Sequence, residues 1–242
     1  MRVGSLEFSP ATWPTVVTLC LLGVLLALGF WQLDRAEQKR ALLARYASGK
    51  GQAVLRLEPG MTRFEGLAYQ RAAAGGRYDS AHQFLLDNRT HEGLAGYHVL
   101  TPLVLDGSNQ AVLVDRGWVP VGGSRERLPA VAVDDAPRQV RGLLRLPPKR
   151  VFMLGDEEPR GRWPYRIQHV DIEALGRELG YPLLPVLLLL DPDEDDGYVR
   201  DWRPLHFGPE RNIGYAVQWF GLAAALLVIY LVVNTHRIDR QE

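Results

Sequence analysis

Two long apolar runs dominate the hydrophobic pattern of the chain, one near each end. Residues 213–233 contain no charge, and at about 1.5 Å of rise per residue a helix of this length matches a hydrocarbon core of roughly 30 Å. Residues 13–31 form the second uncharged run. The alternative for residues 213–233 is a buried helix of a soluble domain, but such helices rarely carry about 18 or more consecutive apolar residues. We therefore predict a transmembrane helix in each run.

The N-terminal run also has the position of a cleaved signal peptide, because only Arg2 and a short polar segment precede it. However, it is longer than the usual apolar region of a signal peptide. The bulky residues 30–33, Phe-Trp-Gln-Leu, stand where small residues should mark a cleavage site. We therefore expect an uncleaved anchor.

Two transmembrane helices place both termini on one side of the membrane and residues 34–212 on the other side. The intervening segment is too long for its own charges to set the orientation, so Arg2, Arg237 and Arg240 provide the signal. Positively charged flanks favour the cytoplasm. We therefore predict a multi-pass membrane protein with cytoplasmic termini and a large extracytoplasmic domain.

Between the apolar runs the pattern changes from helical to β-rich. Residues 33–47 contain strong helix formers, which predicts that the first helix continues beyond the membrane. Short apolar runs broken by Gly, Pro, Asn and Asp then predict strands at residues 53–58, 69–78, 83–87, 97–105, 111–114 and 139–146. This spacing favours an antiparallel sheet or small barrel over alternating βαβ units, so we predict an α+β fold.

The C-terminal part of this domain has one clear helical pattern. Residues 171–179 begin with a potential N-cap, Asp171, and end before Gly180. The compact apolar residues 183–190 follow as a predicted strand, and the acidic residues 191–196 are then expected to form a solvated loop. Calcium binding is the alternative for this loop, but its acidic residues lack the spacing of an EF-hand.

Composition narrows the functional classes. Lys and Arg number 28, as do Asp and Glu, so the zero net charge gives no reason to expect nucleic acid as a partner. The only cysteine, Cys20, lies inside the first apolar run. The domain therefore has no disulfide and no paired cysteines for copper binding or thiol exchange.

No common enzyme motif is present: the chain has no GxSxG, HExxH or Walker A sequence. Polar groups do occur at the expected strand ends, in residues 87–90 (Asp-Asn-Arg-Thr) and 115–118 (Asp-Arg-Gly-Trp). A structural role, with Trp118 in the core and Arg89 and Arg116 bonded to nearby carbonyl or carboxylate oxygens, is the simpler interpretation. We therefore predict that the protein is not an enzyme.

None of the six histidines has the spacing of a metal site. His206 lies seven residues before the second apolar run, where an imidazole would hold a lipophilic metal cofactor such as a haem at the membrane surface. The alternative is an exposed histidine that only forms hydrogen bonds.

Several segments taken together resemble the surfeit-locus-one (Shy-type) family of cytochrome c oxidase assembly factors, and the resemblance covers almost the whole chain in the same order. The segments are Gly29-Phe-Trp-Gln-Leu-Asp-Arg35, Gly76-Arg-Tyr-Asp79, Leu85-Leu-Asp-Asn-Arg-Thr90, Gly96-Tyr-His-Val-Leu-Thr-Pro102, Val112-Leu-Val-Asp-Arg-Gly-Trp-Val119 and Gly214-Tyr-Ala-Val-Gln-Trp-Phe220.

The resemblance implies an assembly factor of the bacterial inner membrane with its domain in the periplasm. Its implied role is to assist haem a insertion into, or stabilisation of, subunit I of an aa3-type oxidase, with haem A synthase as a further partner. Many members carry a histidine where this chain has Asn212, so His206 is the candidate substitute ligand. Arg89 and Arg116 are the candidate contacts of the haem propionates, because guanidinium groups suit carboxylates.

Two other functions remain open from the residues alone. A membrane-anchored sensor domain would bind a small extracytoplasmic ligand, but it would usually continue into a cytoplasmic signalling domain, and only nine residues follow Val233. A membrane-anchored hydrolase is the other alternative, and the missing nucleophile motifs disfavour it.

Gln218, the one strongly polar side chain of the second run, is expected to face the first helix or a partner.

Overall fold

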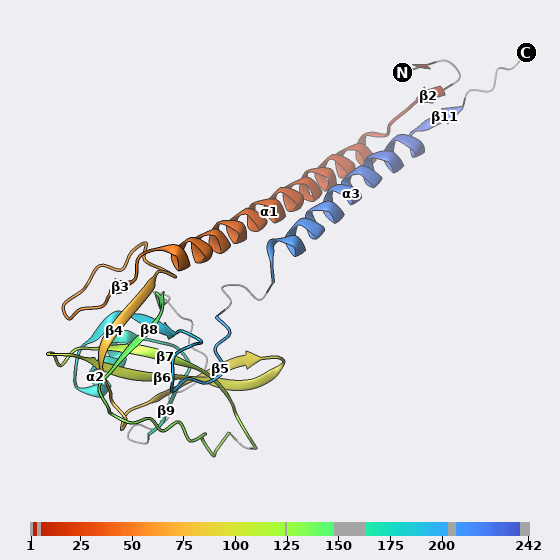
Figure 1. The fold of residues 1–242 in the computed structure, drawn as a ribbon. Helices are drawn as coiled ribbons and strands as arrows, with labels where there is room; N and C mark the ends of the chain where they lie inside the picture. The colour runs from red at the N-terminus through yellow and green to blue at the C-terminus, as the bar shows by residue number, and fades with distance from the viewer. Residues whose placement is uncertain (1, 4–5, 124, 148–162, 203–206, 238–242) are drawn as a thin grey trace, which may run out of the picture. The chain divides into compact units, whose positions relative to one another are not determined.

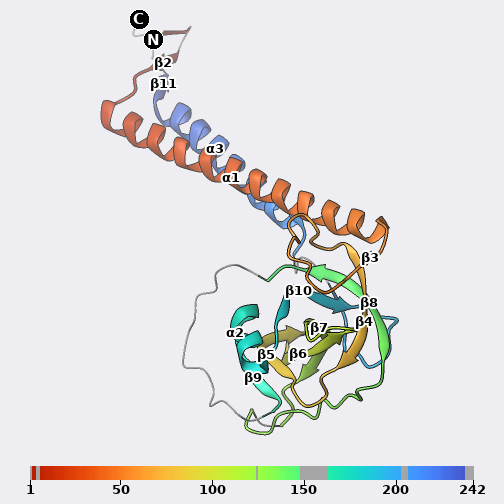
Figure 2. The ribbon, with the colours of Figure 1, turned by 90° about the vertical axis from the view of Figure 1, so that its left-hand side faces the viewer.

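The computed structural model describes residues 2–3, 6–123, 125–147, 163–202 and 207–237, and the chain forms two compact units (Figures 1 and 2). Unit 1 consists of Met1–Ala44 and Pro204–Glu242, and unit 2 consists of Arg45–Arg203. Unit 1 is built mainly from helices and unit 2 mainly from strands.

Helices α1 (Thr12–Gly51) and α3 (Pro209–Val233) contain the two apolar runs. In each case the apolar part is long enough to cross a membrane, and few of its side chains are buried by the rest of the chain. The expectation of two apolar helices flanking a β-rich domain is confirmed. Helix α1 continues through the charged residues 33–47, as their helix-forming composition predicts.

Within unit 1, α1 and α3 run side by side in both views (Figures 1 and 2). The rings of Phe30 and Phe220 meet edge to face at 5.3 Å, and the hydroxyl groups of Thr15 and Tyr230 lie 2.7 Å apart. At one end of this pair a small sheet, which sequence patterns did not predict, joins β1 (Arg2–Val3), β2 (Leu6–Phe8) and β11 (Thr235–Arg237). Strands β2 and β11 are antiparallel, so the segments before α1 and after α3 meet at the same end of the helix pair.

Unit 2 contains a small barrel of five strands. In order around the barrel they are β4 (Arg71–Tyr78), β8 (Arg138–Arg145), β10 (Leu183–Leu190), β7 (Ala111–Pro120) and β6 (Leu94–Leu105). An additional antiparallel pairing between β4 and β6 closes the barrel. Strands β10 and β7 are parallel, whereas the other neighbours are antiparallel. The predicted β-rich α+β domain is therefore confirmed in its barrel form.

Three further strands and one helix surround the barrel. Strand β5 (Phe84–His91) pairs with β6 and with β9 (Tyr165–Ile167), and β3 (Leu55–Arg56) lies beside β4. Helix α2 (Ile172–Leu179) begins as predicted, because the Asp171 carboxylate accepts a 3.0 Å hydrogen bond from the Ala174 amide. It ends at Gly180, whose φ of +78° is easily adopted by glycine.

The barrel interior is packed with small and branched apolar side chains. These include Ala72, Ala74, Leu103, Val112, Val114, Val140, Leu144, Leu184, Val186, Leu188 and Leu190. A second cluster joins α2 to the outer surface of the barrel, where Leu175 packs with Phe84, Leu100, Leu113 and Leu187. A methyl group on Gly142 of β8 would collide with the Leu189 carbonyl oxygen of β10, so this close approach requires glycine.

Some predicted bounds were wrong. The first strand of the domain is only Leu55–Arg56, and the strand expected to end at residue 114 continues to Pro120. Asp115 and Arg116 therefore lie inside β7 and not at its end. The predicted strand was too short because two ionisable residues resemble a loop unless tertiary partners satisfy them. The short strand β9 was not predicted, since three residues carry almost no pattern.

Candidate functional site

The residues that the sequence singled out in Asp115-Arg116-Gly117-Trp118 lie in the middle of the domain. Gly117 adopts a φ of +115°, and the ladder between β6 and β7 shifts register near this point. Such an irregularity changes the direction of neighbouring side chains. It allows the Asp115, Arg116 and Trp118 side chains, all at most 6 % exposed, to occupy separate surroundings.

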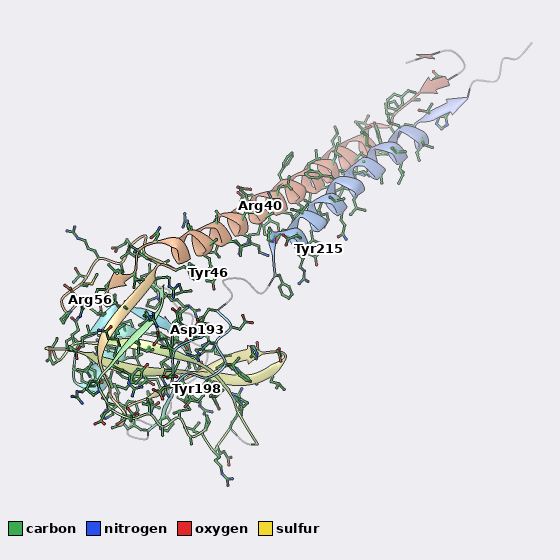
Figure 3. All side chains as sticks on the ribbon, in the orientation of Figure 1. Arg40, Tyr46, Arg56, Asp193, Tyr198 and Tyr215 are labelled. Atoms are coloured by element: carbon green, nitrogen blue, oxygen red, sulfur yellow. The ribbon has the colours of Figure 1, made fainter. Side chains whose placement is uncertain are left out.

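Arg116 lies in a closed network of neutral acceptors. Its Nε donates to the Asp196 carbonyl at 2.8 Å, and its Nη1 donates at 3.1 Å to both Gln83 Oε1 and the Val131 carbonyl. The Tyr198 ring, labelled in Figure 3, lies 5.1 Å from the guanidinium carbon. Burial lowers the pKa of Arg116, although the neighbouring Tyr198 opposes this change. These contacts support the packing of the domain, and the predicted propionate contact would have to replace some of them.

His98 on β6 is held by the neighbouring strand. Its Nδ1 lies 2.8 Å from Asp115 Oδ2 and 3.0 Å from Oδ1, while Oδ1 also accepts a 3.1 Å hydrogen bond from the Gly117 amide. When Nδ1 donates to the carboxylate, Nε2 keeps the free lone pair of the ring. The Trp202 ring lies against the imidazole at 5.5 Å. Buried Asp115 therefore fixes both the orientation and the tautomer of His98.

Arg89 lies inside β5, just after an irregularity in the strand, and not at a strand end as the sequence predicted. The pairing with β6 shifts register between Leu86 and Arg89, and Asn88 has a φ of +57°. Arg89 Nε is buried and has no hydrogen-bond partner among the residues that the structure describes, while its main-chain oxygen accepts a 3.1 Å bond from Trp118 Nε1. Since buried donors are normally paired, this unpaired Nε is a candidate contact for an anion.

Arg89 has one cationic neighbour, Arg145, and one anionic neighbour, Asp115. Burial lowers the pKa of its guanidinium, the positive charge of Arg145 lowers it further, and Asp115 opposes both effects. Arg145 is exposed on β8. We call Arg89, His98, Asp115 and Arg145 the His98 cluster. Its two guanidinium groups outnumber its single carboxylate, which favours an anionic ligand such as a carboxylate.

Arg89 was predicted from the sequence as a site residue, whereas His98 was not. The sequence separation of His98 and Asp115 matches no recognisable motif. The two residues come together only because β6 pairs with β7. The one available signal was the presence of both residues in the segments quoted for the family resemblance.

A second carboxylate, Asp79, links distant parts of the domain. Its Oδ2 lies 2.7 Å from His82 Nδ1 and accepts a 2.7 Å hydrogen bond from the Tyr181 hydroxyl. Burial raises the pKa of Tyr181, and the Asp79 carboxylate raises it further. This arrangement ties the loop after β4 to the segment between α2 and β10, and we assign it a structural role.

Arginines of the barrel strands form ion pairs with the acidic loop at residues 191–196. Arg71 lies 2.5 Å from an Asp191 carboxylate oxygen, and Arg141 Nε donates to Glu194 at 2.7 Å. The described residues form a loop, as predicted. Asp191, Glu194 and Asp196 therefore pair with arginines of the barrel strands, and no group of three potential metal ligands occurs among the described residues.

Within unit 1, the position of greatest interest is Asn212 near the start of α3. Its Nδ2 donates a 2.6 Å hydrogen bond to Gln32 Oε1 of α1. An amide nitrogen with no available lone pair is not an iron ligand, so Asn212 serves as a contact between the helices. The predicted ligand His206 lies outside the described residues.

Comparison with known proteins places these features in a family context. The sequence profile of the SURF1 family matches residues 19–224 of this chain. A SURF1-like protein of Rickettsia bellii is 26% identical over 217 residues, which cover 86% of each chain. Surfeit locus protein 1 of Takifugu rubripes is 24% identical over 214 residues, or 82% of this chain and 87% of the relative. An uncharacterized SURF1-like protein of Mycobacterium bovis is 28% identical over 186 residues, or 72% and 64% of the two chains.

Proposed function

Because the chain belongs to the SURF1 family, we propose that it is an assembly factor for an aa3-type haem-copper cytochrome c oxidase. The carrying observation is that the family match spans residues 19–224, and so includes most of both apolar helices and all strands of the barrel. In this proposal the protein assists haem a insertion into subunit I, or stabilises that subunit, and also contacts haem A synthase.

The architecture supports a role in handling a lipophilic group. Two apolar helices provide a surface that lipid can cover, and the barrel provides a folded domain for contacts in water. A protein that passes a hydrophobic cofactor to a membrane-embedded client needs both environments. The common end of the helix pair, where β2 meets β11, is also compatible with two crossings of the same membrane.

We place the protein in the bacterial inner membrane as a multi-pass protein, with cytoplasmic termini and a periplasmic barrel. Reporter fusions test this orientation. Alkaline phosphatase fused after Val233 should be inactive, and a fusion in the exposed turn at Gly107 should be active. The reverse pattern would overturn the orientation.

The chemistry of haem a fits Arg89 but does not fit Asn212. The unpaired Nε of Arg89 suits a propionate carboxylate. Asn212 does not suit iron, so the proposed ligand remains His206. When bound, haem a would supply an iron centre that takes an imidazole ligand. The Arg89 guanidinium would hold a carboxylate, and Asp115 would keep His98 oriented beside it.

The main test is a reduced-minus-oxidised spectrum of the detergent-purified protein after co-expression with a haem A synthesis pathway. We expect a stoichiometric haem a band, reduced by His206→Ala. Arg89→Gln should weaken haem retention about tenfold, since it removes a charge-assisted contact. Arg141→Gln is the matched control, because Arg141 is an exposed barrel arginine that pairs with Glu194.

The outcomes separate the two forms of the proposal. Protein without haem that still co-purifies with subunit I would make it a stabilising partner, and the carrier role would be dropped. Equal retention by Arg89→Gln and Arg141→Gln would remove Arg89 from the site. Absence of both haem and subunit I, in a strain whose oxidase assembly does not depend on this protein, would overturn the function itself.

A further inference from the structure

The Gln218 side chain lies on the surface of α3 that faces away from α1. Ala216 and Ala223 are the buried positions nearby, at 1% and 3% exposure. At about 100° per residue, Gln218 is roughly 160° around the helix from Ala216 and about 140° from Ala223. Gln218 is exposed, and no residue in the described parts of the chain forms a hydrogen bond with its amide. The structure therefore excludes the first helix as its partner and leaves the other predicted possibility, a separate chain.

An unpaired amide at this depth is unfavourable. Gln218 lies five residues after Ile213, where the uncharged run begins, and so about 7–8 Å along the helix from that boundary. A primary amide without hydrogen-bond partners is strongly disfavoured in hydrocarbon. Polar side chains in such helices usually mark a packing or functional surface.

The residues around Gln218 permit another helix to approach closely. Gly214, Gly221 and Ala225 share its side of α3, at separations of four, three and four residues along the helix, and all are exposed. A methyl group added at either glycine would meet nothing within 4 Å, so open space surrounds the backbone. Small residues at helical spacing allow two transmembrane helices to pack at short distance. We call Gly214, Gln218, Gly221 and Ala225 the Gln218 face.

We propose that the Gln218 face binds the same face of a second copy of this chain, forming a two-fold symmetric dimer in the membrane. Two copies inserted with the same orientation hold Gln218 at the same depth, which places the two amides opposite each other. A primary amide carries both donors and acceptors, so each Gln218 donates one hydrogen bond to the other and accepts one in return. Neither a charged partner nor a different sequence is required.

This dimer is independent of the proposed oxidase role. It uses exposed residues of the second helix, and it requires no haem. The Thr15–Tyr230 and Gln32–Asn212 contacts join α3 to α1 through other residues, so both helix pairings can exist at once.

Disulfide trapping in native membranes tests the dimer. Cys20 is the only native cysteine, so Cys20→Ala provides a cysteine-free full-length chain. In that background we expect Ala225→Cys to form a covalent dimer on mild oxidation. Ala224→Cys is the matched control, because it is the same residue type at almost the same depth but about 100° around the helix.

The role of the amide is tested by Gln218→Leu combined with Ala225→Cys. Loss of the reciprocal bonds should weaken dimerisation about five- to tenfold, measured as energy transfer between labelled copies over a range of protein-to-lipid ratios. Thermal unfolding of the barrel should be unchanged, which separates lost association from misfolding.

Three results would overturn the proposal. These are equal cross-linking of Ala224→Cys and Ala225→Cys, no cross-linking of either, or unchanged association in Gln218→Leu. Each would mean that reciprocal Gln218 contacts on the Gln218 face do not hold two copies together, and the absence of any cross-link would mean that another chain or lipid covers this face. Haem retention does not enter these readouts, so the dimer and the assembly role can fail separately.

Discussion

Replacing Arg116 by Ala should strongly destabilise the barrel. Arg116 is 2% exposed, and its guanidinium joins oxygens from three separate parts of the domain: Gln83, Val131 and Asp196. The substitution removes every one of these bonds at once. It also leaves buried acceptors without a donor and an empty space beside the Tyr198 ring.

The expected magnitude follows from the bonds that are lost. Hydrogen bonds that involve a charged group each contribute about 1.5–3 kcal/mol, so three of them give roughly 4–9 kcal/mol before compensation. Burial of the guanidinium already costs several kcal/mol, and this cost disappears with the side chain. The net loss in the free energy of unfolding is therefore about 3–5 kcal/mol, or a fall in Tm of roughly 10 °C for a domain of this size.

The assay is urea or thermal unfolding of the detergent-solubilised full chain, followed by tryptophan fluorescence. Arg116→Lys keeps the charge but cannot reproduce the planar set of donors, so it should lose about half as much stability. Arg141→Ala is the control. Its guanidinium side chain is 64% exposed and pairs with Glu194, so the expected loss is below about 1 kcal/mol.

One result would refute this reasoning. If the free energy of unfolding of Arg116→Ala were within about 1 kcal/mol of the wild-type value, the buried network would not stabilise the barrel. If the same variant also lost bound haem, Arg116 would be a ligand contact, as the sequence analysis predicted.

Two further predictions concern the barrel interior. Burial raises the pKa of Tyr78 to about 12, although Arg116 and Arg138 oppose the shift, so the folded state binds this proton more tightly than the unfolded state. The free energy of unfolding should therefore be intact below about pH 10 and fall by about 3 kcal/mol between about pH 10 and 12. In Tyr78→Phe, unfolding measured at both ends of this range should show a smaller fall. An equal fall in the variant and the wild type would contradict the assignment to Tyr78. Gly142→Val places a side chain against the Leu189 carbonyl oxygen, so it should lower the free energy of unfolding by more than about 3 kcal/mol or prevent folding, as measured by circular dichroism. Gly123→Ala is the control: open space surrounds this glycine, so the free energy of unfolding should change by less than about 0.5 kcal/mol.

Local patterns were sufficient for the elements whose structure depends on their own residues. Hydrophobicity and length predicted both apolar helices, because a long uncharged run has few alternatives to a membrane helix or a buried helix. The N-cap at Asp171 and the end of α2 at Gly180 were also readable, since caps depend on residues three or four positions apart. The β-rich class followed from short apolar runs between turn residues.

The site was less accessible from the sequence. Arg89 and Arg116 were identified together as candidate carboxylate contacts, yet the structure gives them different surroundings. The Arg116 guanidinium is bonded within the domain, whereas Arg89 has a buried donor without a partner among the described residues. No local pattern distinguishes these cases, because burial and hydrogen bonding depend on strands that lie far apart in the chain.

The sequence by itself determined the two apolar helices, the β-rich class of the domain between them and the resemblance to an assembly-factor family. Only the tertiary structure decided that the sheet closes into a barrel through the β4–β6 pairing, that Asp115 orients His98, and that Gln218 faces away from α1. The physical reason is the range of the interactions. Helix formation and membrane compatibility are properties of consecutive residues, whereas strand pairing, burial of charge and the direction of a lone amide depend on which distant segments are neighbours.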